Sequence, residues 1–156
     1  LAASAAETAQ IAAESAASAA QAAQTAAEEA ATSVTSGAFD VQIDGGGAVI
    51  ATGIIGDVYI PFDLTLTGYT LLGANSPGAI KIDIWKAPYA SFPPTNADSI
   101  CNGHEPTIAA TATAAQDLDI SGWSGEAVTA GSVLRFNVDS CTTLVRALLS
   151  LNFTRT

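Results

Sequence analysis

The chain has 156 residues and a formal net charge of -10, with fifteen acidic residues against five basic ones. So few Lys and Arg side chains argue against sequence-independent nucleic-acid binding and against adhesion to an anionic membrane, because both need cations at phosphates. Two cysteines, Cys101 and Cys141, are too few for a disulfide scaffold. We expect free thiols, with one Cys101–Cys141 bridge as the alternative.

The composition changes sharply near Ser36 and Gly37. Residues 1–36 contain no glycine, proline, aromatic or basic residue, whereas all 13 glycines and 6 prolines lie at or after Gly37. This shift predicts two parts, a rod over residues 1–36 and a head over residues 37–156. The sequence starts at Leu1 and has no methionine, so we expect it to be the end of a longer chain.

Residues 2–31 follow a heptad pattern when Ala2 is placed at position a. Positions a, d and e are all alanine, and the f positions are Glu7, Glu14, Gln21 and Glu28. This pattern predicts a parallel or antiparallel coiled coil; a single exposed helix or an Ala/Ser linker is the alternative. The a and d positions form the predicted oligomerisation seam: Ala2, Ala5, Ala9, Ala12, Ala16, Ala19, Ala23, Ala26 and Ala30.

The alanine seam buries little apolar surface, about 0.8 kcal/mol for each methyl-sized group. The backbone entropy lost on ordering the rod is several times larger. We therefore expect the rod to depend on a head that oligomerises and holds the helices together. Recurring polar residues exclude a transmembrane span, and the segment lacks the basic start of a signal peptide.

After Gly37 the apolar period changes to two, as in "FDVQID", "IKIDIW" and "LRFNVD". Short strands separated by Gly, Pro, Asn and Ser predict an antiparallel β-sandwich or jelly roll. The chain is thus expected to be mainly β, with an N-terminal coiled coil. The predicted strands cover residues 39–44, 49–55, 57–62, 64–72, 80–85, 108–114, 134–139 and 144–152.

The last predicted strand is apolar on both faces. Val145, Ala147, Leu149 and Leu151 form one face, and Leu144 and Leu148 lie on the other. A neighbouring subunit is the cover we expect for the second face. We also expect Trp85 to lie in a subunit interface and Trp123 to pack beneath its Gly-Ser turn.

The sequence "APYASFPPTNADSICNGHEP", residues 87–106, is the longest stretch without strand character. A loop this long in a small domain is more often functional than accidental. Tyr89 and Phe92 are expected to be exposed, and aromatic rings at a surface can stack on sugar rings. Candidate receptor-binding residues in this loop are Tyr89, Phe92, Asn96, Asn102 and His104.

Other patterns give weaker chemical signals. "DLDISG", residues 117–122, copies the start of a calcium loop, but Val128 stands where a bidentate Glu belongs, so a self-capped turn is favoured. His104 is the only histidine and has no clustered ligands, so no metal site is predicted. Ser99, Cys101 and His104 match no nucleophile signature, and the acidic pairs Asp40/Asp44 and Asp117/Asp119 are more simply solvent-facing than glycosidic. We expect no enzyme activity and no cofactor.

The alanine-rich rod together with "GDVYIPFDLTLTGYTLL", "IDIWKAPYASFPPTNADSI", "DISGWS" and "AGSVLRFNVDSCTTLVRALLSL" resembles the stalk and C-terminal head of bacteriophage tail fibres. The resemblance implies a homotrimeric virion fibre protein that attaches to a host-surface protein or glycan by multivalent, non-covalent binding. It also implies contacts with other virion proteins through a preceding segment. The alternatives are a capsid-attached fibre or spacer whose head clamps the trimer, and a cellular trimeric adhesin.

Overall fold

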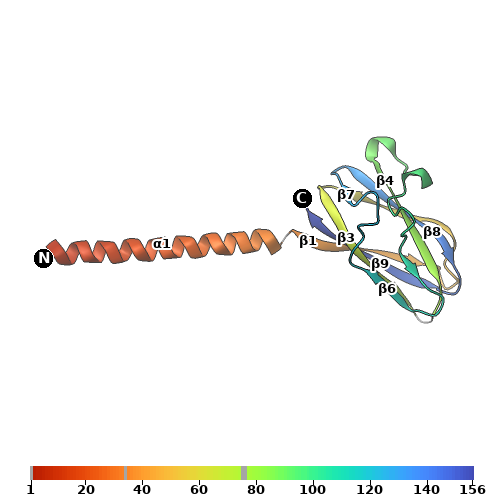
Figure 1. The fold of residues 1–156 in the computed structure, drawn as a ribbon, viewed down its shortest axis with the longest axis horizontal. Helices are drawn as coiled ribbons and strands as arrows, with labels where there is room; N and C mark the ends of the chain where they lie inside the picture. Colours follow the sequence, from red (N-terminus) through yellow and green to blue (C-terminus); the bar gives the residue numbers. More distant parts are fainter. Residues whose placement is uncertain (1, 34, 75–76) are drawn as a thin grey trace. The chain divides into compact units, whose positions relative to one another are not determined.

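The computed structural model describes residues 2–33, 35–74 and 77–156. The protein is mainly β, with antiparallel sheets and one N-terminal helix (Figure 1). It divides into two compact units, Leu1–Thr35 and Ser36–Thr156. The sequence predicted the division between Ser36 and Gly37, one residue after the observed one, because strand β1 already begins at Ser36.

Helix α1 spans Ala2–Ser33. Its described side chains, from Ser4 to Ala30, are all exposed, including every predicted seam alanine except Ala2, whose side chain lies outside the described residues. Hydrogen bonds from Gln10 to Glu14 and from Gln24 to Glu28 join positions four residues apart, at b and f in the heptads, opposite the alanine seam. The helix is confirmed, and the coiled coil stays a prediction.

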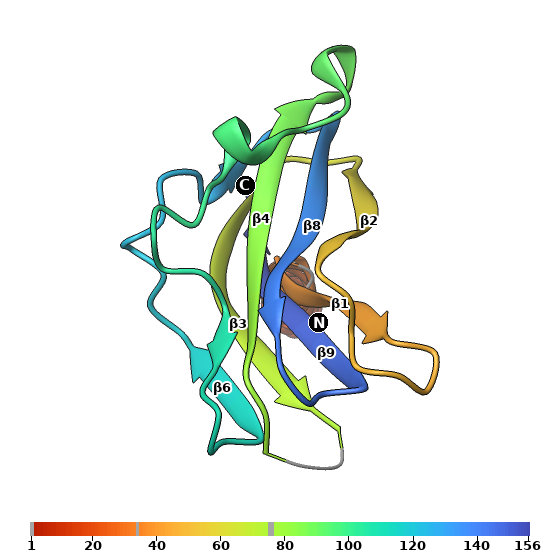
Figure 2. The ribbon, with the colours of Figure 1, turned by 90° about the vertical axis from the view of Figure 1, so that its right-hand side faces the viewer.

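Within residues 35–74 and 77–156, the head contains nine strands, which lie in two sheets (Figure 2). One sheet has the order β1-β9-β3-β6, with β7 also pairing with β3, and the other has the order β2-β8-β4-β5. All the named pairings are antiparallel. The strands are β1 (Ser36–Asp44), β2 (Gly53–Ile60), β3 (Leu64–Gly73), β4 (Ile80–Pro88), β5 (Thr107–Ile108), β6 (Ala114–Asp117), β7 (Ala127–Val128), β8 (Ser132–Cys141) and β9 (Arg146–Arg155).

One hydrophobic core takes side chains from both sheets. Alternation along β4 places Ile80, Ile82 and Ile84 in it, each fully buried, and Phe136 on β8 lies in the same cluster. We call the face of each sheet that points away from this core its outward face. The prediction of a mainly β head with antiparallel sheets is confirmed.

Three strand predictions need correction. Residues 49–55 and 57–62 were expected to be two strands, but β2 is a single strand with an irregular register between Ile54 and Gly56. Val49 and Ile50 precede it in a loop, where the Ile50 N–H donates to the Leu144 carbonyl. The predicted strand 108–114 is broken by a turn into β5 and β6, and β7 was not predicted.

The prediction for Leu144 is also wrong. Strand β9 begins only at Arg146, and the turn before it carries Leu144 into the core, where it is fully buried. Leu148 does lie opposite the buried Leu149, on the outward face. Alternation alone could not place Leu144, because the period of two holds only within a strand.

The segment after β4 folds back along the outward face and the edge of the four-stranded sheet. It contains two short 3-10 helices, η1 (Tyr89–Ser91) and η2 (Asn96–Asp98). The Ile100 N–H donates to the Ile84 carbonyl at 2.9 Å, and the Ile82 N–H donates to the Pro106 carbonyl at 3.0 Å. The segment therefore occupies the exposed edge of β4 beyond β5.

This segment buries Trp85, which is only 8% exposed and forms an isolated bridge with Ser99. The expectation that a subunit interface covers Trp85 is corrected, since its own chain covers it. Trp123 is buried as predicted, and its indole N–H donates to the His104 carbonyl. Its ring stacks on that of Tyr69, with 6.2 Å between the ring centres. Cys101 and Cys141 are free thiols, as expected.

Candidate functional site

The register of β2 and β8 brings four side chains together on the outward face of the four-stranded sheet. Tyr59 lies opposite Val133, and Asp57 lies opposite Arg135. Because side chains two residues apart share one face, these pairs form two neighbouring rows. The opposite faces of the same strands carry Ile60, Leu134 and Phe136 into the core.

Backbone contacts fix the start of the loop beside these rows. Pro88 pairs with Ser132 at the end of β4, and the Tyr89 N–H donates to the Gly131 carbonyl at 2.9 Å. The loop then turns through η1, with the Phe92 N–H donating to the Tyr89 carbonyl at 3.1 Å. In Figure 2 this turn lies at the end of β4, next to β8.

A buried carboxyl group anchors the far part of the loop. Asp83 is only 4% exposed and lies on the outward side of β4. Its Oδ1 accepts hydrogen bonds from the Ile84 N–H at 2.8 Å and from the Ser99 hydroxyl at 2.6 Å, and its Oδ2 accepts one from the Trp85 indole at 2.6 Å. Three donors offset the desolvation of a buried carboxyl group. Asp83 thus holds the loop to the sheet.

Strand pairing and loop together leave a shallow hollow of about 370 Å³. We call it the aromatic pocket, and it is lined by Asp57, Tyr59, Tyr89, Phe92 and Val133. Its rings are unusually open to solvent, with Tyr59 57%, Tyr89 71% and Phe92 48% exposed. Val133, at 4% exposed, forms its floor. The volume falls in the usual range for small-molecule sites.

Arg135 and Asp57 form a bidentate ion pair at the edge of the pocket. Arg135 Nε lies 2.7 Å from Asp57 Oδ1, and Nη2 lies 2.9 Å from Oδ2. This hydrogen-bonded carboxylate raises the pKa of Arg135 above its already high ordinary value. The guanidinium also lies 5.0 Å from the centre of the Phe92 ring and donates to the Pro94 carbonyl at 3.4 Å. Arg135 therefore fixes both Asp57 and Phe92.

The structure brings together two of the five predicted receptor-binding residues. Tyr89 and Phe92 line the aromatic pocket, but Asn96, Asn102 and His104 do not. Asn96 starts η2 and is exposed. Asn102 donates to the Gly122 carbonyl at 3.2 Å, and His104 is exposed beside the same loop. The five predicted residues therefore do not form one site.

The other chemical patterns resolve into local structure. Asp117 accepts a hydrogen bond from the Asp119 N–H, and Asp119 accepts one from the Ser121 N–H, which is the self-capped turn that the sequence favoured. Across the described ranges, no three His, Cys, Asp or Glu side chains are grouped as a metal site would require.

The side chains of Ser99, Cys101 and His104 lie in different environments. The Ser99 hydroxyl donates to Asp83, while His104 is exposed. Burial raises the pKa of the Cys101 thiol, which favours the unreactive protonated form. In the part of the chain with described positions, no helix has the length and apolar character needed to cross a bilayer.

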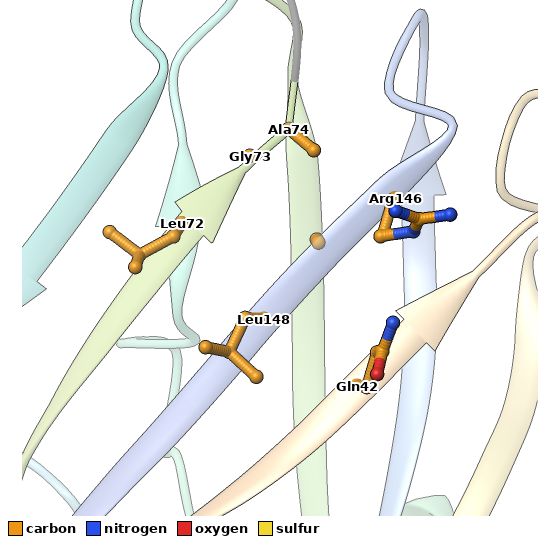
Figure 3. A pocket seen from close by; sticks show the side chains of 7 residues that line it. Gln42, Leu72, Gly73, Ala74, Arg146 and Leu148 are labelled. Carbon is orange, nitrogen blue, oxygen red and sulfur yellow. The ribbon is translucent and has the colours of Figure 1, made fainter.

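A second hollow, of about 310 Å³, lies on the outward face of the five-stranded sheet. Figure 3 shows Leu72 from β3 beside Leu148 from β9, with Gln42 and Arg146 at its polar side. Leu72 and Leu148 are register partners, and Leu72 is 44% exposed. Arg146 lies 3.2 Å from Asp44 in an exposed ion pair.

Sequence reasoning missed Asp57, Tyr59, Val133 and Arg135. A signal was present, because "DVYI" places Asp57 and Tyr59 on the side opposite Val58 and Ile60. Tyr59 is a large aromatic residue on the polar side of this alternating strand, and the structure shows that it is exposed. The pairing of that strand with Arg135, 78 residues away, was not readable from spacing.

Comparisons with known proteins give little further information. No model of a known protein family matches the chain, and no curated protein matches it. Among solved structures it is similar to one described as "Structure of infectious bursal disease virus Gx strain", with 17% sequence identity and a TM-score of 0.33. That match covers 76% of this chain and 29% of the other, and a likeness of this size carries no conclusion about function.

Proposed function

We propose that this protein is a homotrimeric virion fibre protein of the phage tail-fibre type, whose head attaches to a host-surface receptor through the aromatic pocket. The observation that carries the proposal is the gathering of three exposed rings, Tyr59, Tyr89 and Phe92, around one hollow. Exposed aromatic clusters of this kind are enriched at binding surfaces. Three copies would raise the avidity of a weak site.

The strand order supports the finer description of the head as a jelly-roll sandwich. The first sheet takes β1, β3, β6 and β9, the second takes β2, β4, β5 and β8, and each sheet interleaves early with late strands. Eight strands divided in this way correspond to two Greek keys. The small strand β7 is an addition at the edge of β3.

The exposed alanine face of α1 supports self-association of the chain, and the number of three copies comes from the resemblance to tail fibres. From Ser4 to Ala30 no helical side chain is buried, so the helix gains no packing from its own unit. An isolated helix is only marginally stable in water, and helices in proteins derive most of their stability from tertiary packing. Other copies of the same helix would provide that packing along the alanine seam.

A matched pair of substitutions tests the assembly. Ala16→Glu places a carboxylate at a seam position, and Ala17→Glu places the same group one residue later, at position b. Light scattering coupled to size-exclusion chromatography should give a trimer for the parent chain. Because the head is expected to hold the copies together, the seam is read from helix content: circular dichroism at 222 nm should show a loss of helix for Ala16→Glu and none for Ala17→Glu. A monomeric parent chain would contradict the trimer, and equal helix content in the two variants would contradict the proposed coiled coil.

Attachment is tested with the labelled full chain and a panel of bacterial strains. Binding to at least one strain is expected, with a large loss for Tyr89→Ala and for Phe92→Ala. The control is Ile54→Ala, which removes a 54% exposed side chain from the same β2 strand that carries Tyr59, outside the pocket. A folded chain that binds no strain, or binds regardless of the pocket variants, would overturn the attachment role.

The hollow between Leu72 and Leu148 favours a second candidate, a fibre or spacer whose head only clamps the trimer. In that role the outward face of the five-stranded sheet would meet another copy. The same experiments separate the two functions, because a clamp predicts stable trimers with no binding to cells.

A further inference from the structure

The aromatic pocket offers its occupant flat apolar surfaces from three different segments. Tyr59 comes from β2, Tyr89 from η1 and Phe92 from the residue after η1. The Arg135 guanidinium covers one face of the Phe92 ring, yet the ring remains 48% exposed. A pyranose ring has a face of C–H groups that packs on such rings, and a pocket of about 370 Å³ accommodates one or two sugar units.

Asp57 supplies the orienting polar group. Each of its oxygens accepts one hydrogen bond from Arg135, and each carboxylate oxygen has a second lone pair. The Asp57 side chain is 31% exposed, whereas that of Arg135 is 12% exposed. A ligand therefore reaches the acceptor more readily than the cation. Two neighbouring hydroxyl groups of a sugar are donors of the kind that this carboxylate can accept.

The charges of the head disfavour an anionic occupant. Each of the five basic side chains already has a partner in the structure. The pairs are Lys81 with Glu105, Lys86 with the Gly125 and Ala127 carbonyls, Arg135 with Asp57, Arg146 with Asp44, and Arg155 with the Phe62 ring. Among the described residues, no cation faces the pocket unpaired, and the net charge of the chain repels anions.

We infer that the aromatic pocket binds a neutral sugar of a host glycan, with its ring stacked on Tyr89 and Tyr59 and its hydroxyl groups donating to Asp57. This inference rests on the attachment function proposed above and names the ligand class. Arg135 is the positioning residue: it holds the Asp57 carboxylate and the Phe92 ring without contacting the sugar.

The test titrates the full chain with methyl glycosides of glucose, galactose and mannose, and with the corresponding uronic acids, followed by NMR chemical shifts. At least one neutral glycoside should bind more tightly than its uronic acid. Tyr89→Ala should weaken that binding by about tenfold or more, and Ile54→Ala should leave it unchanged. Affinity should change little as salt is raised, because no charge pair forms.

Asp57→Asn separates the two ligand classes. It removes an acceptor that the neutral sugar needs, so binding of the neutral glycoside should fall. It also releases the charge of Arg135, so a pocket that is really built for anions would bind uronic acids more tightly in this variant. Thermal unfolding verifies the fold, which should persist because a surface ion pair contributes little to stability.

The outcomes divide cleanly between the two proposals. Preference for uronic acids, or neutral binding that Tyr89→Ala and Asp57→Asn leave intact, would overturn the inference. If no sugar binds while attachment to cells still depends on Tyr89, the inference fails and the attachment function stands with a different ligand. If neutral sugars bind through the pocket but no cells are bound, the inference stands and the attachment function fails.

Discussion

The two sheets of the head differ most at their outward faces. The four-stranded sheet is covered by residues 88–106, which bury Asp83 and Trp85 and leave the aromatic pocket beside them. The five-stranded sheet carries short polar side chains such as Asp40 and Gln42, both exposed, around the pair Leu72 and Leu148. A long connection can bury polar groups and shape a site, while a face without one keeps to the alternating pattern of its strands.

The largest effect that tests this difference is expected at Asp83. Asp83→Asn replaces one acceptor oxygen with an amide donor, which must face the Trp85 indole N–H or the Ser99 and Ile84 donors. A buried donor left without an acceptor should lower the free energy of unfolding by about 2–4 kcal/mol. Urea denaturation measures this loss.

Asp40→Asn is the matched control on the other outward face. Asp40 is exposed on β1, so the same change should alter the free energy of unfolding by less than about 0.5 kcal/mol. Equal losses at the two positions would mean that the two faces do not differ in the way described.

A smaller effect is expected when one donor to Asp83 is removed. Ser99→Ala deletes the 2.6 Å hydrogen bond but leaves Oδ1 with the Ile84 N–H. The loss should be about 1–2 kcal/mol, whereas Ser150→Ala on β9, on the uncovered face, should stay within about 0.5 kcal/mol. Hydrogen exchange should also speed up at the Ile100 amide, which bonds to the Ile84 carbonyl. Unchanged exchange there would argue against Asp83 and Ser99 as the anchor of the loop.

Leu72→Ala tests whether the uncovered face is bare in solution. Leu72 is 44% exposed, so its truncation should change the free energy of unfolding by about 0.5 kcal/mol or less. The dependence of the melting temperature on protein concentration should then be the same in Leu72→Ala as in the parent chain. A loss above about 2 kcal/mol, with a weaker dependence of the melting temperature on concentration than in the parent chain, would show that another copy covers this face.

Particular residues show how far the sequence predicts this molecule. Alternation in "IKIDIW" correctly places Ile80, Ile82 and Ile84 in the core, because a strand with one buried face dictates its pattern locally. The same alternation could not tell that Asp83 and Trp85 are buried, since their cover comes from Ser99 and its neighbours in another segment. For the pocket, the exposed Tyr89 and Phe92 were predictable from a long loop, but Tyr59 and Arg135 needed the pairing of β2 with β8.

The smallest expected effect is a loss of stability in acid, and one carboxyl group on the side of each sheet contributes to it. Hydrogen bonds from the backbone N–H and the hydroxyl of Thr95 lower the pKa of Asp98, in the loop that covers one sheet. Hydrogen bonds from the Gly46 N–H and from Arg146 lower the pKa of Asp44, on the uncovered side. The ordinary value of both is 3.8.

Because the folded pKa of each carboxyl group lies below its unfolded value, its stabilisation is complete above pH 3.8 and is lost as the pH falls through the folded value. Urea denaturation at a series of acidic pH values should show this decline. Asp98→Asn removes the contribution of the covered side, and Asp44→Asn removes that of the uncovered side. The free energy of unfolding of each variant should therefore lie below that of the parent chain at neutral pH and approach it in acid. If only Asp44→Asn differs from the parent chain at neutral pH, the Thr95–Asp98 cap is not formed in solution. The covered loop would then depend on Asp83 for its anchorage.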